Sequence, residues 1–221
     1  MLFDLTLSRD IGRLIRAIKT MTRIPVAVLT NGTLLSRKDV RRDLAAADIV
    51  VPSLDAVPAA LFRRINRPHA SLDNRKIIDG LVRFREEFSG EIRLEIMLVK
   101  GVNDSSAHIQ ALKTAVARIR PDKIELNTVV RPPADPGAGP LSAAALDRIR
   151  AELGPKAEVV ASFASADALL GSEGMEMLVP EDAPRRFFRG KEEPPEGWEA
   201  AGFDDSSWER GAGKFAFGTV G

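Results

Sequence analysis

Apolar and polar residues follow two alternating patterns along residues 1–162. In one pattern, apolar residues recur every three or four positions, which predicts amphipathic helices. In the other, apolar runs too short for a helix are rich in β-branched residues, which predicts strands. The expected helices cover 8–22, 36–47, 58–65, a segment from Ser71 or Asp73 through Phe84, 105–119 and 142–153, and the expected strands cover 25–29, 48–52, 92–99, 123–127 and 157–161.

The alternation of helices and strands predicts an α/β fold with a parallel sheet and right-handed crossovers. Such a sheet either closes toward a barrel or stays open and doubly wound. Because the chain starts on a helix, we expect the first strands of the fold to be missing from it. In strand 92–99, apolar residues occupy both alternating sets of positions, which predicts that both faces are covered. Arg93 and Glu95 interrupt one of these sets.

The remaining residues differ in composition from the first part. Residues 163–185 are expected to form a linker or a short helix over 165–176. Residues 186–221 contain both tryptophans and many glycines and prolines, a composition that suits short strands and turns. Because so few residues cannot close a sandwich, we expect an incomplete β-type tail.

Composition and charge exclude several classes of function. The net charge is +1, from 32 basic and 31 acidic residues, so no strong field attracts nucleic acid or anionic lipid. No apolar run is long enough to span a membrane and no secretory signal is recognisable, so a cytoplasmic location is expected. The chain has no cysteine, which excludes disulfides and metal or cluster sites built on its own thiolates. With only two histidines, a histidine-based metal site is also disfavoured.

Polar residues stand at the carboxyl ends of four predicted strands, the edge where α/β folds bind ligands. Each group alone suits a turn or a helix cap. Four groups on one rim predict a site for a polar small molecule, although no P-loop or GxGxxG motif accompanies them. The residues are Thr30 and Asn31, then Ser53 and Asp55, then Lys100, Asn103 and Asp104, and finally Asn127 and Thr128.

Four further residues have alternative roles. Arg67 precedes a proline, so we expect its backbone to be extended; its side chain is either solvated or binds an anion. His69 suits an ordinary loop histidine better than a ligand. Arg93 and Glu95 are two residues apart in a strand and therefore point the same way. They either form a buried ion pair or hold a substrate, because an unpaired buried charge is costly.

Four segments carry a family resemblance: 24–35 (IPVAVLTNGTLL), 51–56 (VPSLDA), 62–69 (FRRINRPH) and 95–104 (EIMLVKGVND). In this order and spacing they resemble radical S-adenosylmethionine proteins, within a match covering about residues 8–133. The nearest branch is the Fe-S oxidoreductases related to wyosine-type and molybdenum-cofactor-type radical enzymes. The resemblance implies a partial (β/α)6 TIM-like barrel of about four to five strands, which holds S-adenosylmethionine against a 4Fe-4S cluster.

The resemblance also implies roles for individual residues. Ser53 would contact S-adenosylmethionine with Asp55 beside it, and Arg93 would reach the substrate. The full predicted cofactor-binding set is Thr30, Asn31, Ser53, Asp55 and Asn127, with Asn127 on the adenine side. The full predicted substrate-binding set, combining the resemblance with the strand-end pattern, is Arg67, Arg93, Glu95, Lys100 and Asn103. No catalytic residue and no metal ligand is assigned.

The chain departs from this family in one decisive feature. The family holds its cluster with a CxxxCxxC loop, and this chain contains no cysteine. We expect that loop, and the family's glycine- and glutamate-rich motif, to lie before the first residue, so the chain is expected to be inactive alone. Segments within 187–218 resemble, more weakly, the start of a galactose-binding-like β-sandwich, which favours a fragment or a chimera.

Three functions therefore compete. The first is a truncated radical S-adenosylmethionine domain that has lost its cluster. The second is a binding or assembly module that another chain completes. The third is a cluster-free barrel enzyme that uses Lys100 or Arg93 with Glu95 and Asp55 for acid–base chemistry. The expected partners are a small-molecule substrate and a complementing chain, with no nucleic acid and no membrane.

Overall fold

The computed structural model describes residues 4–130, 133, 135, 137–161, 184–187, 204, 206–207 and 209–212 of the 221-residue chain. Contacts divide the chain into two compact units, Met1–Phe163 and Ala164–Gly221. Among the described residues, no helix is long and apolar enough to cross a membrane.

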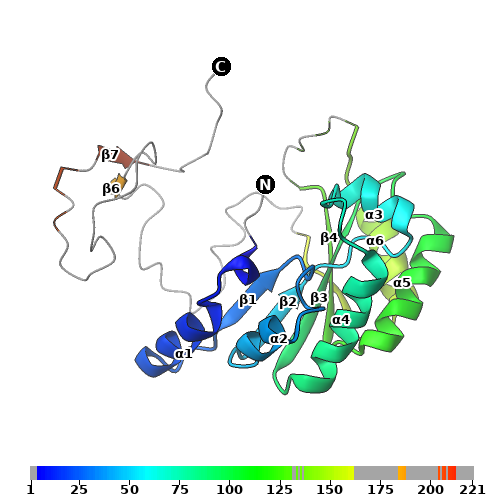
Figure 1. Ribbon diagram of the computed structural model, residues 1–221. Coiled ribbons are helices and arrows are strands. Elements are labelled where there is room, and N and C mark those ends of the chain that lie inside the picture. The colour runs from blue at the N-terminus through cyan, green and yellow to red at the C-terminus, as the bar shows by residue number, and fades with distance from the viewer. Residues whose placement is uncertain are drawn as a thin grey trace. The chain divides into compact units, whose positions relative to one another are not determined.

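The first unit is an α/β fold built on a five-stranded parallel sheet, in which the strands follow one another in the order β1-β2-β3-β4-β5 (Figure 1). This confirms the predicted parallel sheet with alternating helices. The strands are β1 (Ala27–Thr30), β2 (Ile49–Pro52), β3 (Glu91–Leu98), β4 (Lys123–Thr128) and β5 (Ala157–Val159). The helices are η1 (Leu5–Leu7), α1 (Ile11–Met21), α2 (Lys38–Leu44), α3 (Ala59–Asn66), α4 (Asn74–Glu87), α5 (Ser106–Ile119) and α6 (Ala143–Leu153).

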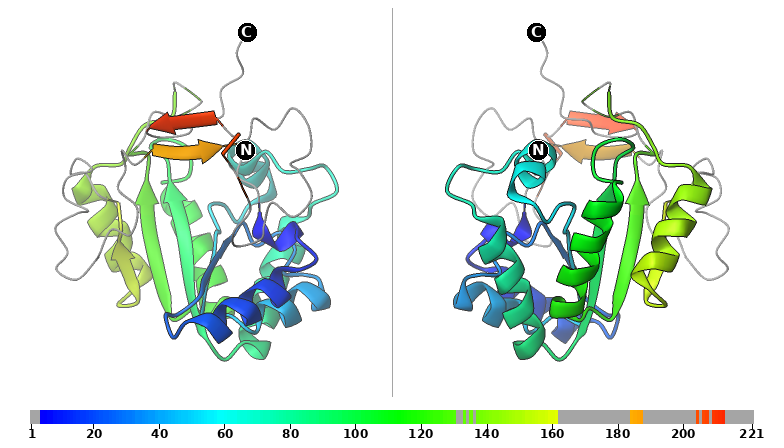
Figure 2. Two further views of the ribbon diagram at one scale, coloured as in Figure 1. Left: turned by 90° about the vertical axis from the view of Figure 1, so that its left-hand side faces the viewer. Right: turned by 90° about the vertical axis from the view of Figure 1, so that its right-hand side faces the viewer.

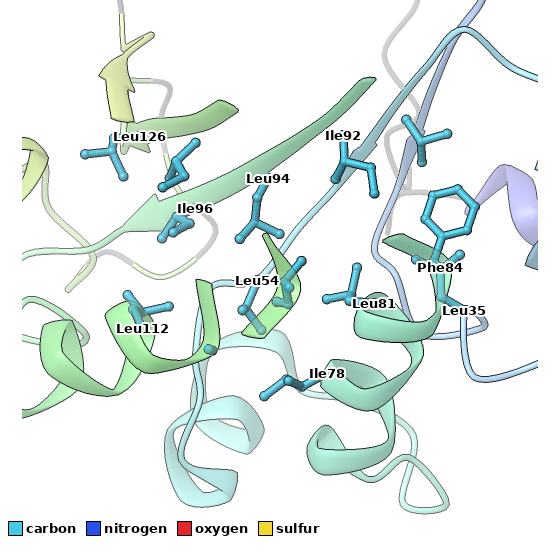
Figure 3. Packing of buried hydrophobic residues seen from close by; sticks show 14 of the residues in the cluster. Leu35, Leu54, Ile78, Leu81, Phe84, Ile92, Leu94, Ile96, Leu112 and Leu126 are labelled. Atoms are coloured by element: carbon cyan, nitrogen blue, oxygen red, sulfur yellow. The ribbon is translucent and has the colours of Figure 1, made fainter. Parts of the chain in front are cut away.

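One face of the sheet carries the hydrophobic core. Along β3 every second residue is buried, and Leu94 and Ile96 belong to the same cluster as buried side chains of α1, α2, α4, α5 and α6. Figure 3 shows part of this cluster, with the β3 residues beside Leu81 and Phe84 of α4. The views in Figure 2 show these helices along one side of the curved sheet. The other side, which we call the open face, is free of these helices.

The open face corrects one sequence prediction. Apolar positions on both sides of β3 predicted cover on both faces. In the structure Glu91, Arg93, Glu95 and Met97 are only partly buried, because all the helices in the core cluster pack on the opposite side. The charges of Arg93 and Glu95 therefore indicated the partial exposure of this face better than the apolar Met97 indicated its burial.

Helix caps test the predicted starts. Ser105 and Ser142, the first residues of two predicted helices, are the caps of α5 and α6 and accept hydrogen bonds from the backbone N–H groups of His108 and Ala145. Of the two alternatives for α4, Asp73 is the cap. The helices predicted to begin at Ser8 and Ser36 begin later, at Ile11 and Lys38. Their cap positions are Asp10 and Arg37, neither of which makes a side-chain cap. The 3-10 helix η1 was not predicted.

A glycine allows α4 to pack closely against the loop before α2. A Cβ atom on Gly80 would lie 2.5 Å from the backbone nitrogen of Ser36 and 2.9 Å from the carbonyl oxygen of Leu35. No side chain fits there without moving backbone. Gly80 therefore fixes the distance between α4 and this loop.

The described residues of the second unit include an antiparallel pair of strands, β6 (Pro184–Phe187) and β7 (Glu209–Ala212). The predicted helix at 165–176 lies outside the described residues. The resemblance of the tail to a galactose-binding-like sandwich stays a prediction.

Candidate functional site

The open face carries a band of polar side chains at the carboxyl-terminal half of the sheet. This band follows from the register of the strands, because the side chains of residues opposite each other on parallel strands point to the same face of the sheet. Ser53 forms an isolated bridge with Glu95, and Glu95 lies opposite Glu125, which in turn lies opposite Glu158. Two residues further along β3, Met97 lies opposite Asn127.

Three residues predicted at the site are joined by hydrogen bonds. The Ser53 hydroxyl donates to Glu95 Oε2 at 3.3 Å, and Asn127 Nδ2 donates to Glu95 Oε1 at 3.4 Å. Both distances are long for hydrogen bonds to a carboxylate, which are usually below 3 Å. The three side chains therefore form a weakly held donor and acceptor set that a ligand can enter.

Arg93 pairs with residues other than Glu95. Its Nε and Nη2 atoms donate to the two carboxylate oxygens of Glu91 at 3.0 and 3.1 Å, and its Nη1 lies 3.8 Å from Glu125 Oε1. These hydrogen bonds, donated by Arg93, lower the pKa of Glu91 and raise the pKa of Arg93. The predicted ion pair between Arg93 and Glu95 is therefore not the one formed: Arg93 pairs with Glu91 and Glu125 on the same face as Glu95, and its substrate-binding role stays a prediction.

Two members of the carboxylate row, Glu125 and Glu158, were not predicted from the sequence. Burial raises the pKa of Glu125, with further raising by Glu158 and Glu95, against the lowering effect of Arg93. Like charges directly opposite in a sheet are destabilising, so this row favours a positively charged neighbour. The signal in the sequence was a glutamate in each of three successive strands. Among the residues that the structure describes, no group of three or more His, Cys, Asp or Glu could hold a metal ion.

Asp55 lies in the turn after β2, next to Glu95. Its Oδ1 accepts a hydrogen bond from the Met97 backbone N–H at 2.9 Å, and its Oδ2 accepts one from Asn66 Nδ2 at 2.7 Å. Burial raises its pKa and Glu95 adds to the effect, whereas the two hydrogen bonds lower it. The pKa of Asp55 is raised overall, so the fold disfavours the charged form of its carboxyl group. Asn66 had no signal in the sequence beyond its position before Arg67.

This pKa shift predicts a pH dependence for Asp55→Asn. Because the folded-state pKa of Asp55 is raised, its contribution to stability is full below about pH 3.9, its unfolded value, and is lost as pH rises through the folded value. Asn keeps an acceptor for Met97, and the amide of Asn66 can turn to face it. The variant is therefore expected to gain stability relative to the wild type between pH 4 and 7. Urea unfolding across this range measures the difference; a constant difference would contradict the assignment.

Asn103 is placed inside the fold and not at the open face. Its side chain is fully buried, accepts a hydrogen bond from the Val99 N–H at 2.7 Å, and donates to the carbonyl oxygens of Asp55 and Met97 at 2.9 and 2.8 Å. His108 extends this link, with Nδ1 2.6 Å from the Asn103 carbonyl oxygen and Nε2 accepting from the Val57 N–H at 3.3 Å. Burial lowers the pKa of His108. Both residues tie the turn after β2 to the turn after β3.

The end of β1 is occupied by Asp4. Its carboxylate accepts from the Thr30 hydroxyl at 3.0 Å and from the Asn31 backbone N–H at 3.2 Å. The Asn31 side chain is exposed and bonds to Thr33. Among the described residues, no side-chain hydrogen bond therefore joins Thr30 or Asn31 to the group around Glu95.

Arg67 and Lys100, both predicted to bind substrate, lie on the rim. Arg67 is exposed and 3.8 Å from Asp135, and its backbone is left-handed at φ 43° and ψ 53°. The prediction of an extended backbone is wrong, because Arg67 ends α3 in the left-handed conformation common after helices. Lys100 is also exposed, and its backbone N–H donates to the Gly139 carbonyl oxygen at 3.0 Å.

A separate hollow of about 520 Å³ lies at the opposite, amino-terminal end of β3 and β4, lined by Arg85, Glu86, Arg120 and Asp122. Arg85 is already paired with Asp122 at 2.6 Å and donates to the carbonyl oxygens of Phe88 and Gly90. None of the predicted site residues lines this hollow, and the open face is the better candidate for a functional site.

Sequence comparison finds partial matches to curated proteins. The chain is 42% identical over 126 residues to a GTPase Obg of Brachyspira hyodysenteriae, covering 57% of this chain and 18% of that protein. It is 36% identical over 112 residues to a UPF0026 protein of Methanocaldococcus jannaschii, covering 51% and 35% respectively. A UPF0026 protein of Helicobacter pylori is 34% identical over 128 residues, covering 58% and 41%. The chain thus spans less than half of each relative, and no family model matches it.

Solved structures show the fold. A domain of pyruvate-formate lyase-activating enzyme from Bacteroides vulgatus superposes with a TM-score of 0.57 at 20% identity, covering 72% of this chain and 95% of that one. Streptococcus suis SuiB bound to S-adenosylmethionine gives 0.52 at 16%, covering 76% and 39%. A radical SAM methyltransferase from Sphaerobacter thermophilus gives 0.50 at 24%, covering 62% and 40%. The first unit therefore has a fold that resembles part of the radical S-adenosylmethionine barrel.

Proposed function

We propose that the first unit is the S-adenosylmethionine-binding part of a radical S-adenosylmethionine protein, with the cofactor on the open face. The group formed by Ser53, Glu95 and Asn127 carries the proposal, because all three point to one place near the carboxyl ends of adjacent strands. Support comes from the fold, which resembles that of SuiB, a protein whose structure is known with S-adenosylmethionine bound.

The chemistry of these side chains fits S-adenosylmethionine. The Glu95 carboxylate can accept from ribose hydroxyls or from the ammonium group, and Asn127 offers an amide to the adenine. The row of carboxylates favours the positive sulfonium centre, whose charge would offset part of their mutual repulsion. Asp55 would position this group, since it holds the Met97 backbone next to Glu95.

The predicted 4Fe-4S cluster does not fit the residues present. Such clusters are held by cysteine thiolates, and this chain has none. We therefore assign this chain binding and orientation of S-adenosylmethionine, and no step of radical chemistry. Substrate-binding roles for Arg67, Arg93 and Lys100 stay proposals of the same kind; Asn103 has no exposed surface with which to take part.

Calorimetric titration with S-adenosylmethionine tests this function. The wild-type chain is expected to bind saturably, and Glu95→Gln to weaken binding about tenfold, corresponding to the ~1.4 kcal/mol expected from one charged hydrogen bond. Ser53→Ala is expected to have a smaller effect in the same direction. Glu86→Gln, on the exposed side of α4, is the control and should bind like the wild type.

Two results would overturn the proposal. One is a wild-type chain that stays folded by circular dichroism yet shows no saturable binding at millimolar S-adenosylmethionine. The other is equal binding by the wild type and a folded Glu95→Gln variant.

A further inference from the structure

The two histidines of this chain lie in opposite surroundings. His69 is exposed, and its Nδ1 atom lies 2.8 Å from the Ser71 hydroxyl oxygen. His108, in the first turn of α5, is 3% exposed. Histidine is the side chain whose ordinary pKa lies closest to neutral pH, so a buried histidine makes the packing around it sensitive to pH.

Both ring nitrogens of His108 have partners, and these partners fix the position of its proton. The Asn103 carbonyl oxygen, 2.6 Å from Nδ1, can only accept, so Nδ1 carries the hydrogen. The Val57 backbone N–H can only donate, over 3.3 Å, so Nε2 is the unprotonated acceptor. The geometry therefore requires a neutral imidazole. A second proton, on Nε2, would face the Val57 N–H, donor against donor.

The turn that His108 contacts, residues 53–57 after β2, is bonded to β3 on its other side. The Leu54 N–H donates to the Glu95 carbonyl oxygen at 2.9 Å, and the Met97 N–H donates to the Asp55 carboxylate at 2.9 Å. These bonds place the turn beside the side chains of the open face. A shift of the turn would therefore move atoms next to the proposed cofactor site.

Three side chains hold the backbone of the same turn from the side of α4 and α5. Asn74 donates to two of its carbonyl oxygens at 2.8 Å each, and Asn103 donates to a third at 2.9 Å. His108 accepts from the N–H of Val57. Of these three side chains only His108 can gain a proton near neutral pH, so its bond is the one that pH can break.

Charged groups on the surrounding elements are bonded elsewhere or lie in solvent. Three carboxylates accept hydrogen bonds from groups other than the His108 ring: Asp55 in the turn after β2, Asp73 at the start of α4 and Asp104 in the turn after β3. The basic residues of α3, the start of α4, the turn after β3 and the N-terminal part of α5 are exposed: Arg63, Arg64, Arg75, Lys76, Lys100 and Lys113. Among the described residues, none of these groups forms a hydrogen bond or an ion pair with the ring.

The direction of the pH effect follows from this environment. Burial lowers the pKa of His108 more than its bond to Asn103 raises it. The stability that the neutral ring contributes is therefore full above about pH 6.5, the unfolded value, and is lost as pH falls through the folded value. The N-terminal turn of a helix also disfavours a positive charge.

We propose that His108 is a positioning residue: its neutral ring holds the turn after β2, and a proton on Nε2 releases Val57 and weakens binding of S-adenosylmethionine on the open face. The second half of this inference rests on the proposed function. The protonated ring keeps its bond to the Asn103 carbonyl oxygen, whereas the Val57 N–H turns away because two donors repel each other. The displaced turn carries Ser53 and Asp55 with it.

Nuclear magnetic resonance of the full chain tests the link directly, because two histidines give two sets of ring signals. His69 is expected to titrate near the ordinary value of about 6.5, and His108 at a lower pH. The backbone amide signals of Val57 and Asp55 are expected to shift with the midpoint of His108. This measurement needs no variant, so it holds even where a substitution at His108 prevents folding.

Two matched variants separate the histidines. His108→Gln keeps a donor and an acceptor in the side chain but removes the titration, so the Val57 amide should no longer shift with that midpoint. His69→Gln removes the exposed ring and should leave the shift of Val57 as in the wild type. Melting temperatures establish that both variants are folded.

Calorimetric titration with S-adenosylmethionine measures the effect on the open face. It is carried out about one pH unit above and about one unit below the midpoint measured for His108. Over this range the neutral fraction of the ring falls roughly tenfold, so the wild-type affinity relative to that of His108→Gln is expected to fall at least about fivefold. The comparison cancels the titration of carboxylates, which both proteins share, and His69→Gln should behave like the wild type.

Three results would overturn the inference: a His108 ring that titrates like His69, turn amides whose midpoint differs from that of His108, or the same change of affinity with pH in the wild type and a folded His108→Gln variant. Failure of the proposed function is distinguishable from these. A chain that binds no S-adenosylmethionine at any pH, while the Val57 amide follows His108, would overturn the proposed function and the cofactor half of this inference, and would establish the positioning of the turn.

Discussion

Asn103→Ala is expected to lower the free energy of unfolding by at least about 3 kcal/mol. The substitution leaves three buried backbone groups without their hydrogen-bond partner: the N–H of Val99 and the carbonyl oxygens of Asp55 and Met97. An unsatisfied buried polar group costs about 1–3 kcal/mol, so three of them account for the expected loss. Urea unfolding followed by circular dichroism measures it.

Two variants separate this role from a general sensitivity to asparagine replacement. Asn31→Ala removes an exposed side chain bonded to Thr33 and is expected to cost less than about 1 kcal/mol. Asn103→Asp keeps the acceptor for Val99 but places carboxylate oxygen against two carbonyls, so its stability should recover as pH falls and the carboxyl is protonated. A loss below about 1 kcal/mol in Asn103→Ala would show that this link is not required.

Arg41→Ala is expected to lower the free energy of unfolding by about 3 kcal/mol, which is the low end of the range for breaking a buried ion pair. The Arg41 side chain is 5% exposed, and its Nε and Nη2 donate to the two oxygens of Glu87 at 2.9 and 3.0 Å. Its Nη1 donates to the carbonyl oxygens of Leu35 and Ser36 at 2.9 and 3.0 Å. Removal leaves these carbonyls unpaired, while Glu87 remains partly in water.

The neighbouring arginine is the control for Arg41. Arg42 is 76% exposed and lies 3.6 Å from Asp43, so Arg42→Ala is expected to change stability by no more than about 0.5 kcal/mol. Equal effects from the two substitutions would contradict the assigned role. Arg41→Lys should fall between them, because lysine keeps the charge but cannot form the two-pronged contact with Glu87.

The same pair sets an acid dependence. The hydrogen bond from Arg41 lowers the pKa of Glu87. The stabilisation is therefore full above about pH 4.3, the unfolded value, and is lost as pH falls through the folded value. The difference between the wild type and Arg41→Ala is expected to shrink over that acidic range.

Some of the predicted site residues come together and others do not. Ser53 and Asn127, near the ends of β2 and β4, both bond to Glu95 in β3, because neighbouring parallel strands present their carboxyl ends at one edge. Asn103 also follows the end of a strand but is buried, because its side chain forms hydrogen bonds with the backbone of the turns after β2 and β3. Local sequence contains no information that separates these two asparagines.

The α/β class, five strand positions and the orientation of Arg93 and Glu95 toward one side were predictable from the sequence alone. These features depend on periodicity within short segments, which the backbone geometry of helices and strands imposes directly. Which charges pair emerged only from the tertiary structure, as did the pairing of Arg93 with Glu91 and Glu125 and the order of the described strands in the sheet. Those features depend on strand order and on which elements approach one another, and neither is encoded in the pattern of any one segment.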